Sequence, residues 1–160
     1  MSYSEIQRRL KADVIYYSSS LTDQAISSGS TIPWNTAADL IGAAASSYSV
    51  SSGGVITLPS GYWYLLKAQL QVRFSSETGY IKYIWQNSSN VDLGRRGTMI
   101  MQEQPQTFGG DELAVALVDA TSASVDVKLV VQSIAGVAEL NSTTETTWAG
   151  GSRAEIWRLS

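Results

Sequence analysis

An alternation of apolar and polar side chains over residues 64–74 constrains the fold of this chain more than any other feature. The stretch reads YLLKAQLQVRF, and apolar side chains occupy every second position, with Leu65 as the one exception. Successive side chains of a β-strand point to opposite faces, so a period of two indicates a strand with one face against a core. The predicted core face holds Tyr64, Leu66, Ala68, Leu70, Val72 and Phe74.

Three consecutive aromatic residues, Tyr62, Trp63 and Tyr64, open this strand after Pro59 and Gly61. The alternation places Tyr64 on the core face and Trp63 on the opposite face. Trp63 is therefore the ring that we expect to meet a neighbouring subunit, whereas Tyr64 belongs to the core.

Further strand-like segments follow at spacings of about ten residues, separated by Gly, Ser, Asn and Pro turns. These segments are GGVITLP (53–59), GYIKYIWQ (79–86), GTMIMQE (97–103), ELAVALVDA (112–120), SVDVKLVVQSI (124–134) and SRAEIWRLS (152–160). The segment at 112–120 is apolar on both faces, as expected for a strand that is covered on both sides. The pattern predicts an all-β sandwich or barrel of about eight to ten antiparallel strands.

The first 30 residues differ from the rest of the chain. Residues 4–11 suggest a short helix with a capping box, while the sequence DVIYY at 13–17 favours an extended chain. Residues 18–33 are rich in small polar side chains and are typical of a linker. We therefore expect an N-terminal anchoring arm and linker over residues 1–30 and one domain over residues 31–160. The candidate anchoring residues are Ile6, Arg8, Arg9, Leu10, Val14 and Tyr17.

The composition restricts the possible partners of the chain. Only 16% of the 160 residues are charged, well below the usual quarter, which suggests that part of the outer surface is covered by another molecule. The net charge of −3 argues against binding to nucleic acid. No run of about 18 apolar residues exists, and the polar N-terminal residues lack the apolar core of a signal peptide, so we expect neither a membrane span nor secretion.

The chain offers little for catalysis. It contains no His and no Cys, which removes histidine bases, thiolate nucleophiles and the common zinc ligands. The adjacent residues Asp111 and Glu112 are expected to end a turn, and Asp92 with Asn87 and Asn90 to form a solvated hairpin instead of a calcium site. We predict a protein that is not an enzyme, with no catalytic residue, no metal and no cofactor.

The large aromatic side chains are scattered over different predicted strands, so a sugar-stacking patch is not indicated. Aromatic residues concentrate in cores and at the centres of protein interfaces. Our candidates for the interface between subunits are Trp63, Tyr83, Trp85, Trp148 and Trp157.

Four segments resemble the trimeric jelly roll of the tumour necrosis factor and complement globular-head superfamily. They are IPWNT (32–36), ITLPSGYWYLLKAQLQV (56–72), DELAVALVDATSASVDVKLVVQS (111–133) and TTWAGGSRAEIWRLS (146–160), so the resemblance covers residues 31–160. IPWNT looks like the first strand of that fold, and the last segment looks like its closing strand, with Trp148 where the relatives usually have Phe. The resemblance implies a jelly-roll sandwich and a homotrimer, with residues 146–152 near the threefold axis.

The whole chain also resembles small phage virion proteins, which combine a short arm with one cysteine-free jelly roll. This resemblance implies a capsid decoration (cement) protein that binds the major capsid protein, or another virion protein, outside a phage head at threefold positions. An alternative is the receptor-binding tip of a tail fibre or spike, with residues 87–97 and 102–111 contacting a host glycan. The lack of a stalk disfavours this alternative. A secreted cytokine-like ligand is disfavoured by the lack of a signal peptide and of cysteines.

Overall fold

A computed structural model describes residues 14–18, 24–34, 36–37, 48–74, 79–101, 107–109, 112–136, 138–140 and 152–159. Within these ranges all regular structure is β-strand, and every strand pairing is antiparallel, which confirms the all-β prediction. None of the described segments is a helix that could span a membrane. The helix expected at residues 4–11 lies outside the described residues.

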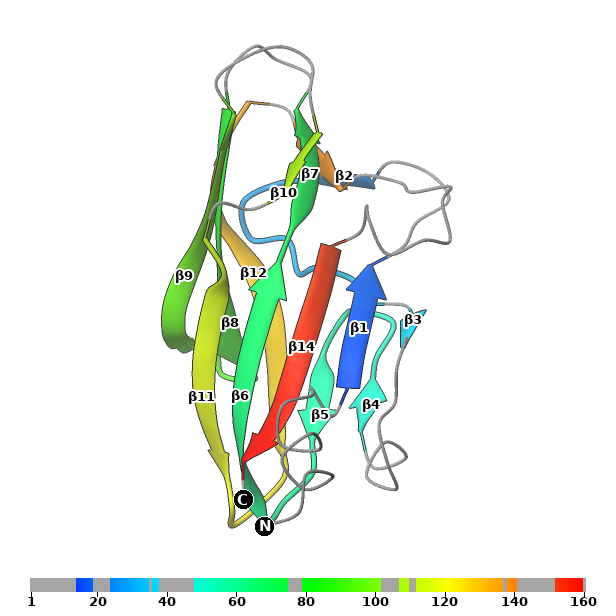
Figure 1. The fold of residues 1–160 in the computed structure, drawn as a ribbon, viewed down its shortest axis with the longest axis vertical. Helices are drawn as coiled ribbons and strands as arrows, with labels where there is room; N and C mark the ends of the chain where they lie inside the picture. Colours follow the sequence, from blue (N-terminus) through cyan, green and yellow to red (C-terminus); the bar gives the residue numbers. More distant parts are fainter. Residues whose placement is uncertain are drawn as a thin grey trace, which may run out of the picture.

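Ten strands form one sheet that curls into two facing layers (Figure 1). The first layer contains, in spatial order, β3 (Thr36–Ala37), β1 (Val14–Ser18), β14 (Ser152–Leu159), β6 (Tyr62–Gln69), β11 (Ala114–Ala120) and β9 (Asp92–Met101). The second layer continues from β9 through β8 (Gly79–Asn87), β12 (Val125–Ala135), β5 (Ile56–Leu58) and β4 (Ser49–Val50).

The two layers are joined where β9 bends. Between Tyr83 and Trp85 the pairing of β8 with β9 shifts register, and Arg95 of β9 pairs instead with Val115 of β11. Gly94 occupies the bend with a φ of 67°, and a Cβ at this position would overlap the carbonyl oxygen of Val115. Only glycine combines this backbone conformation with so close an approach of another strand.

A smaller sheet lies at the upper end of the molecule in Figure 1. Its strand order is β10 (Thr107–Gly109), β7 (Gln71–Phe74), β13 (Ala138–Leu140) and β2 (Gln24–Ile26). Strands β6 and β7 are separated only by the buried Leu70, so one long segment of chain serves both sheets. The hydroxyl of Ser152 accepts a hydrogen bond of 2.9 Å from the backbone N–H of Gln71 near this junction.

The core lies between the two layers and follows the predicted alternation. Tyr64, Leu66, Ala68, Leu70 and Val72 are all buried, as the period of two predicted. They meet the inward residues of the other long strands. Those residues are Ile81, Tyr83 and Trp85 of β8, Ala114, Ala116, Val118 and Ala120 of β11, Val127, Leu129 and Val131 of β12, and Ala154 and Ile156 of β14.

The segment before residue 31 differs from the prediction. Strand β1 pairs with β14, and β2 pairs with β13, so residues 14–18 and 24–26 belong to the sheets. Val14 and Tyr17 are therefore strand residues, as the extended sequence at 13–17 favoured, and they belong to the sheet and not to a separate anchoring arm. The reason is their pairing with residues more than a hundred positions away, which no local pattern reveals. The other anchoring candidates, Ile6, Arg8, Arg9 and Leu10, lie outside the described residues.

The segment IPWNT is also placed differently from expectation. It follows β1 and β2 in the chain and is not the first strand of the fold. Ile32 and Trp34 are buried in the core, and the backbone N–H of Ile32 donates to the carbonyl oxygen of Leu129 at 2.9 Å. The segment therefore packs into the core beside β12.

Candidate functional site: an apolar sheet face

Large apolar side chains gather on the outward face of β11, β6 and β14. The register places Leu117, Leu65 and Trp157 side by side in one row, and Trp63 and Leu159 in the next row. Directly opposite residues of antiparallel strands point to the same face. We call these five residues the apolar face.

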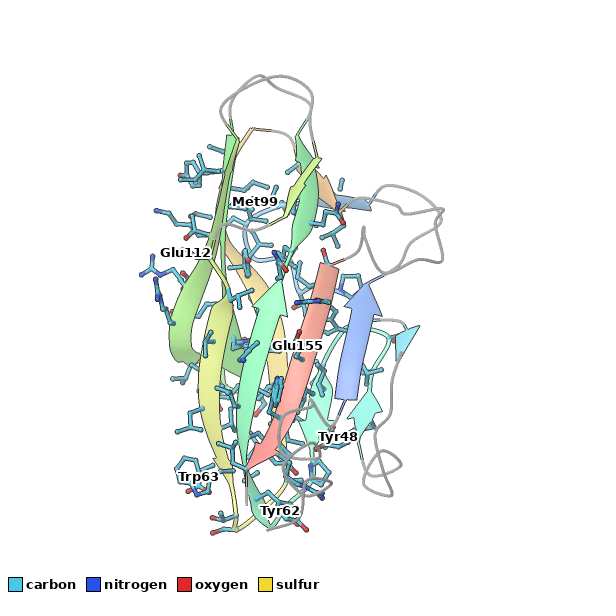
Figure 2. The ribbon with its side chains drawn as sticks, viewed as in Figure 1. Tyr48, Tyr62, Trp63, Met99, Glu112 and Glu155 are labelled. Carbon is cyan, nitrogen blue, oxygen red and sulfur yellow. The ribbon has the colours of Figure 1, made fainter. Side chains whose placement is uncertain are left out.

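Three residues of the apolar face are exposed in the single chain, and Leu65 and Trp157 are half-buried. Leu117 is 57% exposed, Trp63 42% and Leu159 39%. Trp63 projects away from the ribbon near the lower end of β6 and β11 (Figure 2). A contiguous exposed apolar patch on neighbouring strands is the usual mark of a surface that another molecule covers.

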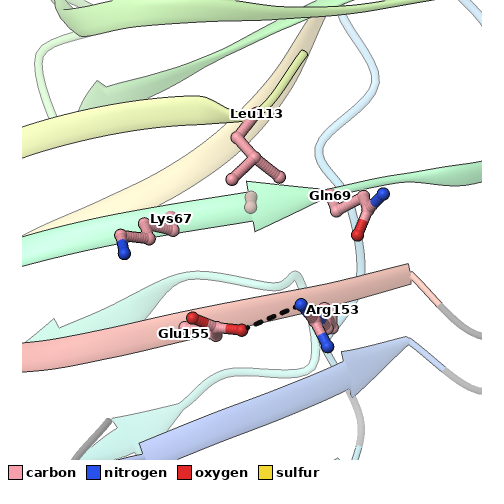
Figure 3. Close-up of a pocket in the computed structure, with 6 residues that line it drawn as sticks. Lys67, Gln69, Leu113, Arg153 and Glu155 are labelled. Carbon is pink, nitrogen blue, oxygen red and sulfur yellow. Dashed lines mark ion pairs between the residues drawn. The ribbon is translucent and has the colours of Figure 1, made fainter. Parts of the chain in front are cut away.

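A polar hollow borders the apolar face toward the upper end of the same three strands (Figure 3). Its volume is about 200 Å³, and Lys67, Gln69, Leu113, Arg153 and Glu155 line it together with Ala68. Arg153 and Glu155 form an ion pair at 3.2 Å, drawn dashed in Figure 3. The hollow is therefore charged, unlike the rows below it.

Trp157 connects the hollow with the apolar face. The ammonium of Lys67 lies 4.9 Å from the centre of the Trp157 ring, and the indole N–H donates to Glu155 at 3.3 Å. The cation–π contact and the hydrogen bond hold the ring against the sheet. Because the ring position is fixed in advance, a partner that packs on it loses little side-chain entropy.

The outward face of the second layer is polar where β5, β12 and the lower part of β8 meet, while Tyr80 and Ile100, paired in register on β8 and β9, are 37% and 50% exposed. The polar side chains are joined by hydrogen bonds from Thr57 to Asp126 (2.7 Å), from Lys128 to Asn90 (2.6 Å), and from Gln86 and Gln132 to Asp92 (2.8 and 2.6 Å). Groups satisfied in this way gain little from a further partner. The apolar face on the first layer, with five large side chains on three strands, is therefore larger than the Tyr80–Ile100 pair on the second layer.

The hairpin at residues 87–91 is closed by its own hydrogen bonds. The side-chain oxygen of Asn87 accepts the backbone N–H groups of Ser89 and Val91, both at 3.0 Å. Among the described residues no cluster of three acidic, His or Cys side chains that could hold a metal ion occurs.

One acidic residue marks the lower rim of the apolar face. Asp119 is paired in register with Trp63. The hydroxyl of Thr121 donates to its carboxylate at 2.6 Å and the backbone N–H of Thr121 at 2.9 Å. These hydrogen bonds lower the pKa of Asp119 from its ordinary value of 3.8, so a negative charge persists at this rim.

Two of the three aromatic residues at the start of β6, Trp63 and Tyr64, point to opposite faces of the strand, as the alternation predicted. Tyr64 is fully buried, and its hydroxyl donates to the carbonyl oxygen of Pro59 at 2.9 Å. Tyr62 packs edge-on against Tyr64, and the guanidinium of Arg158 lies 4.6 Å from the centre of the Tyr62 ring. Trp63 points to the opposite face.

The predicted interface residues lie in different environments in the structure. Trp63 and Trp157 lie on the apolar face, while Trp148 lies outside the described residues. Tyr83 and Trp85 require a correction, since both are fully buried in the core of their own chain. Both point to the same inner side of β8 as Ile81, so neither ring reaches a surface that a neighbouring subunit could touch.

Sequence reasoning missed the aliphatic half of the apolar face, namely Leu65, Leu117 and Leu159. Two signals pointed to them. Leu65 is the exception in the alternation of β6, and the segment 112–120 is apolar on both faces. In the single chain only one face of β11 is covered, because Ala116 is buried while Leu117 is exposed.

Comparison with known proteins supports the fold. A solved structure described as "Structure of Eiger TNF from S. frugiperda" is similar to this chain with a TM-score of 0.62, covering 94% of each chain at 10% sequence identity. The fold is a jelly roll of the tumour necrosis factor type. No protein-family model and no curated protein sequence matches the chain. At this identity the similarity concerns the fold alone.

Proposed function

We propose that the protein is a structural virion component, a homotrimeric capsid decoration protein that binds the outside of a phage head at threefold positions and stabilises it. The observation that carries the assembly part is the apolar face of Trp63, Leu65, Leu117, Trp157 and Leu159. Removing such a surface from water is the main favourable term in protein association.

A trimer is favoured over other oligomers by the jelly-roll fold and by the resemblance to trimeric jelly rolls. Three copies bury the apolar face around a common axis and leave the outward face of the second layer in solvent. The aromatic and aliphatic composition of the face matches the cores of subunit interfaces, where charged residues are depleted.

The capsid-binding part rests on the resemblance of the whole chain to small phage virion proteins. Residues 1–13, which precede β1, are the segment left to act as an anchoring arm. Three arms on one trimer bind with much higher avidity than a single arm. A trimer that binds the assembled lattice and not the free capsid subunits stabilises the shell by mass action.

Light scattering coupled to size-exclusion chromatography tests the assembly part. The expected mass is three times the 17.2 kDa of one chain. A monomer at micromolar concentration would contradict the proposed trimer.

Co-sedimentation with phage heads tests the capsid-binding part. Wild-type protein is expected to sediment with heads, and a variant lacking residues 1–13 is expected to stay trimeric but remain in the supernatant. Attachment by the truncated trimer would move the docking surface to the jelly roll. Selective binding on a glycan array, without binding to heads, would favour a receptor-binding tip instead.

A further inference from the structure

The polar hollow on the first layer brings together more hydrogen-bond donors than acceptors. Lys67 and Arg153 contribute an ammonium and a guanidinium, which only donate, and the carboxylate of Glu155 is the one anionic group among the lining residues. The register explains why they converge, because Lys67 lies directly opposite Glu155, and Gln69 directly opposite Arg153, on β6 and β14. Directly opposite residues of antiparallel strands point to the same face.

The carboxylate of Glu155 is already engaged on both oxygens. Its Oε1 lies 3.2 Å from Nη2 of Arg153, and its Oε2 accepts the indole N–H of Trp157 at 3.3 Å. The side chain of Glu155 is only 18% exposed, so these two contacts hold it against the sheet. Glu155 therefore neutralises Arg153 and leaves the ammonium of Lys67 without an acidic partner.

The cations of the hollow keep open N–H groups. The ammonium of Lys67 lies over the Trp157 ring at 4.9 Å, and no acceptor of the described residues is within hydrogen-bonding distance of it. Arg153 uses one terminal nitrogen on Glu155, and its other N–H groups have no acceptor in the part of the chain that the structure describes. Two cations and one anion leave an excess of one positive charge in the hollow.

We propose that the polar hollow binds the carboxylate of a small organic acid. A carboxylate accepts hydrogen bonds only and carries one negative charge, so it matches both the open donors and the excess charge. A phosphate group brings up to two negative charges, which the hollow does not offset. This inference goes beyond the proposed function and does not depend on the trimer, because one chain supplies every lining residue.

The size and the walls of the hollow limit the rest of the ligand. A volume of about 200 Å³ is below the range of about 300–1,000 Å³ usual for ligand sites, so the ligand is no larger than one sugar acid. Leu113 forms an apolar wall on the β11 side, across from Arg153 and Glu155 of β14 (Figure 3). The carbon skeleton of the acid packs on this wall while its carboxylate reaches the two cations.

Titration followed by NMR tests the site with three probes, namely D-glucuronate, acetate and D-glucose. Both acids are expected to give saturable shifts of the backbone amide signals of residues 67–69 and 153–155, and glucose is expected to give none. Tighter binding of glucuronate than of acetate identifies sugar acids as the ligand class, whereas equal affinities mean that the carboxylate alone is recognised. Absence of saturable shifts with both acids, or equal binding of glucose, overturns the inference.

Substitutions separate the hollow from a general effect of charge. Lys67→Gln is expected to raise the Kd for glucuronate by about tenfold or more. Lys82→Gln is the matched control, since the ammonium of Lys82 also lies over an aromatic ring, Tyr80 at 5.3 Å, but on the second layer, and no change is expected. Glu155→Gln is expected to lower the Kd, because it frees Arg153 and removes a like charge.

The outcomes distinguish this inference from the proposed trimer. Equal losses of affinity in Lys67→Gln and Lys82→Gln, or weaker binding in Glu155→Gln, overturn the carboxylate site. Light scattering on the same samples reports the oligomeric state. A trimer that binds neither acid contradicts the site alone, and a monomer that binds them contradicts the trimer alone.

Discussion

At the scale of single residues, Gly97 shows how closely the core is packed. A Cβ at Gly97 would overlap the ring of Tyr83 and would lie 2.7 Å from the backbone nitrogen of Ala114. The Tyr83 ring is held in place because its hydroxyl donates to the carbonyl oxygen of Glu112 at 2.9 Å. The absence of a side chain at Gly97 is therefore needed for the ring to lie where it does.

We expect Gly97→Ala to lower the free energy of unfolding by about 1–3 kcal/mol, because the added methyl group forces the Tyr83 ring or the strand to move. Urea denaturation at a protein concentration that keeps the oligomeric state constant measures this change. Gly53→Ala is the control, since a Cβ there meets only the Ser51 hydroxyl at 3.8 Å. Equal stability of the two variants would contradict the close packing.

The carboxyl group of Asp119 gives a prediction for pH dependence. Hydrogen bonds from Thr121 lower its pKa in the folded chain, so the resulting stabilisation is present above the unfolded pKa and is lost as the pH falls through the folded pKa. Thr121→Val is expected to raise the pKa of Asp119 toward 3.8, as followed by NMR titration. Thr57→Val, on the other layer, is expected to leave that pKa unchanged. An unchanged pKa in Thr121→Val would reject the assigned cause.

At the scale of elements, the two faces of β11 differ in exposure. Its inward residues Ala114, Ala116 and Ala120 are buried in the core, while Leu117 on the opposite face is 57% exposed. A substitution on the outward face can therefore change association without disturbing the core.

Leu117→Lys is expected to dissociate the proposed trimer, because it replaces the most exposed side chain of the apolar face with a charge that the contact would bury. The unfolding free energy of the dissociated chain is expected to change by less than about 0.5 kcal/mol, as is usual for exposed positions. Val91→Lys is a matched control, because Val91 is 55% exposed and lies in the 87–91 hairpin beyond the apolar face. Light scattering and urea denaturation measure the two effects. Dissociation by both variants would mean that the effect is not specific to the apolar face.

The strands differ in how much of their role could be read from the sequence. The alternation in β6 was enough to predict its buried face, since that signal is local. For β8 the same rule places Tyr83 and Trp85 with Ile81 on the inner face, yet their aromatic character suggested an interface. Residue type alone cannot separate a core aromatic from an interface aromatic, because burial drives both. For β11, which is apolar on both faces, the sequence cannot show which face lies against the core of the chain.

At the scale of the whole molecule, the all-β class followed from the spacing of strands and turns, whereas the position of β1 did not. Strand β1 lies between β14 and β3 in the first layer. Its pairing with β14 joins the beginning of the described chain to its end. Such non-local pairing depends on the complete fold and leaves no trace in a short sequence window.

Truncations that end before and after β1 test its structural role. Removal of residues 1–13 is expected to leave the melting temperature nearly unchanged, because β1 begins at Val14. Removal of residues 1–18 exposes the edge of β14 and is expected to lower the melting temperature and promote aggregation. Thermal denaturation with static light scattering measures both effects. Equal melting temperatures for the two truncations would show that β1 contributes little to the sandwich.

The continuity of β6 and β7 through Leu70 also has a mechanical consequence. This segment runs from the lower end of the sandwich into the upper sheet, and β14 and β11 hold its β6 part on both sides (Figure 1). Tension along the segment loads these hydrogen bonds in shear, so that many must break together. Tension across the sheet unzips them one pair at a time. We therefore expect the chain to survive longer under a load applied along its strands, where the rate of forced unfolding sets the lifetime.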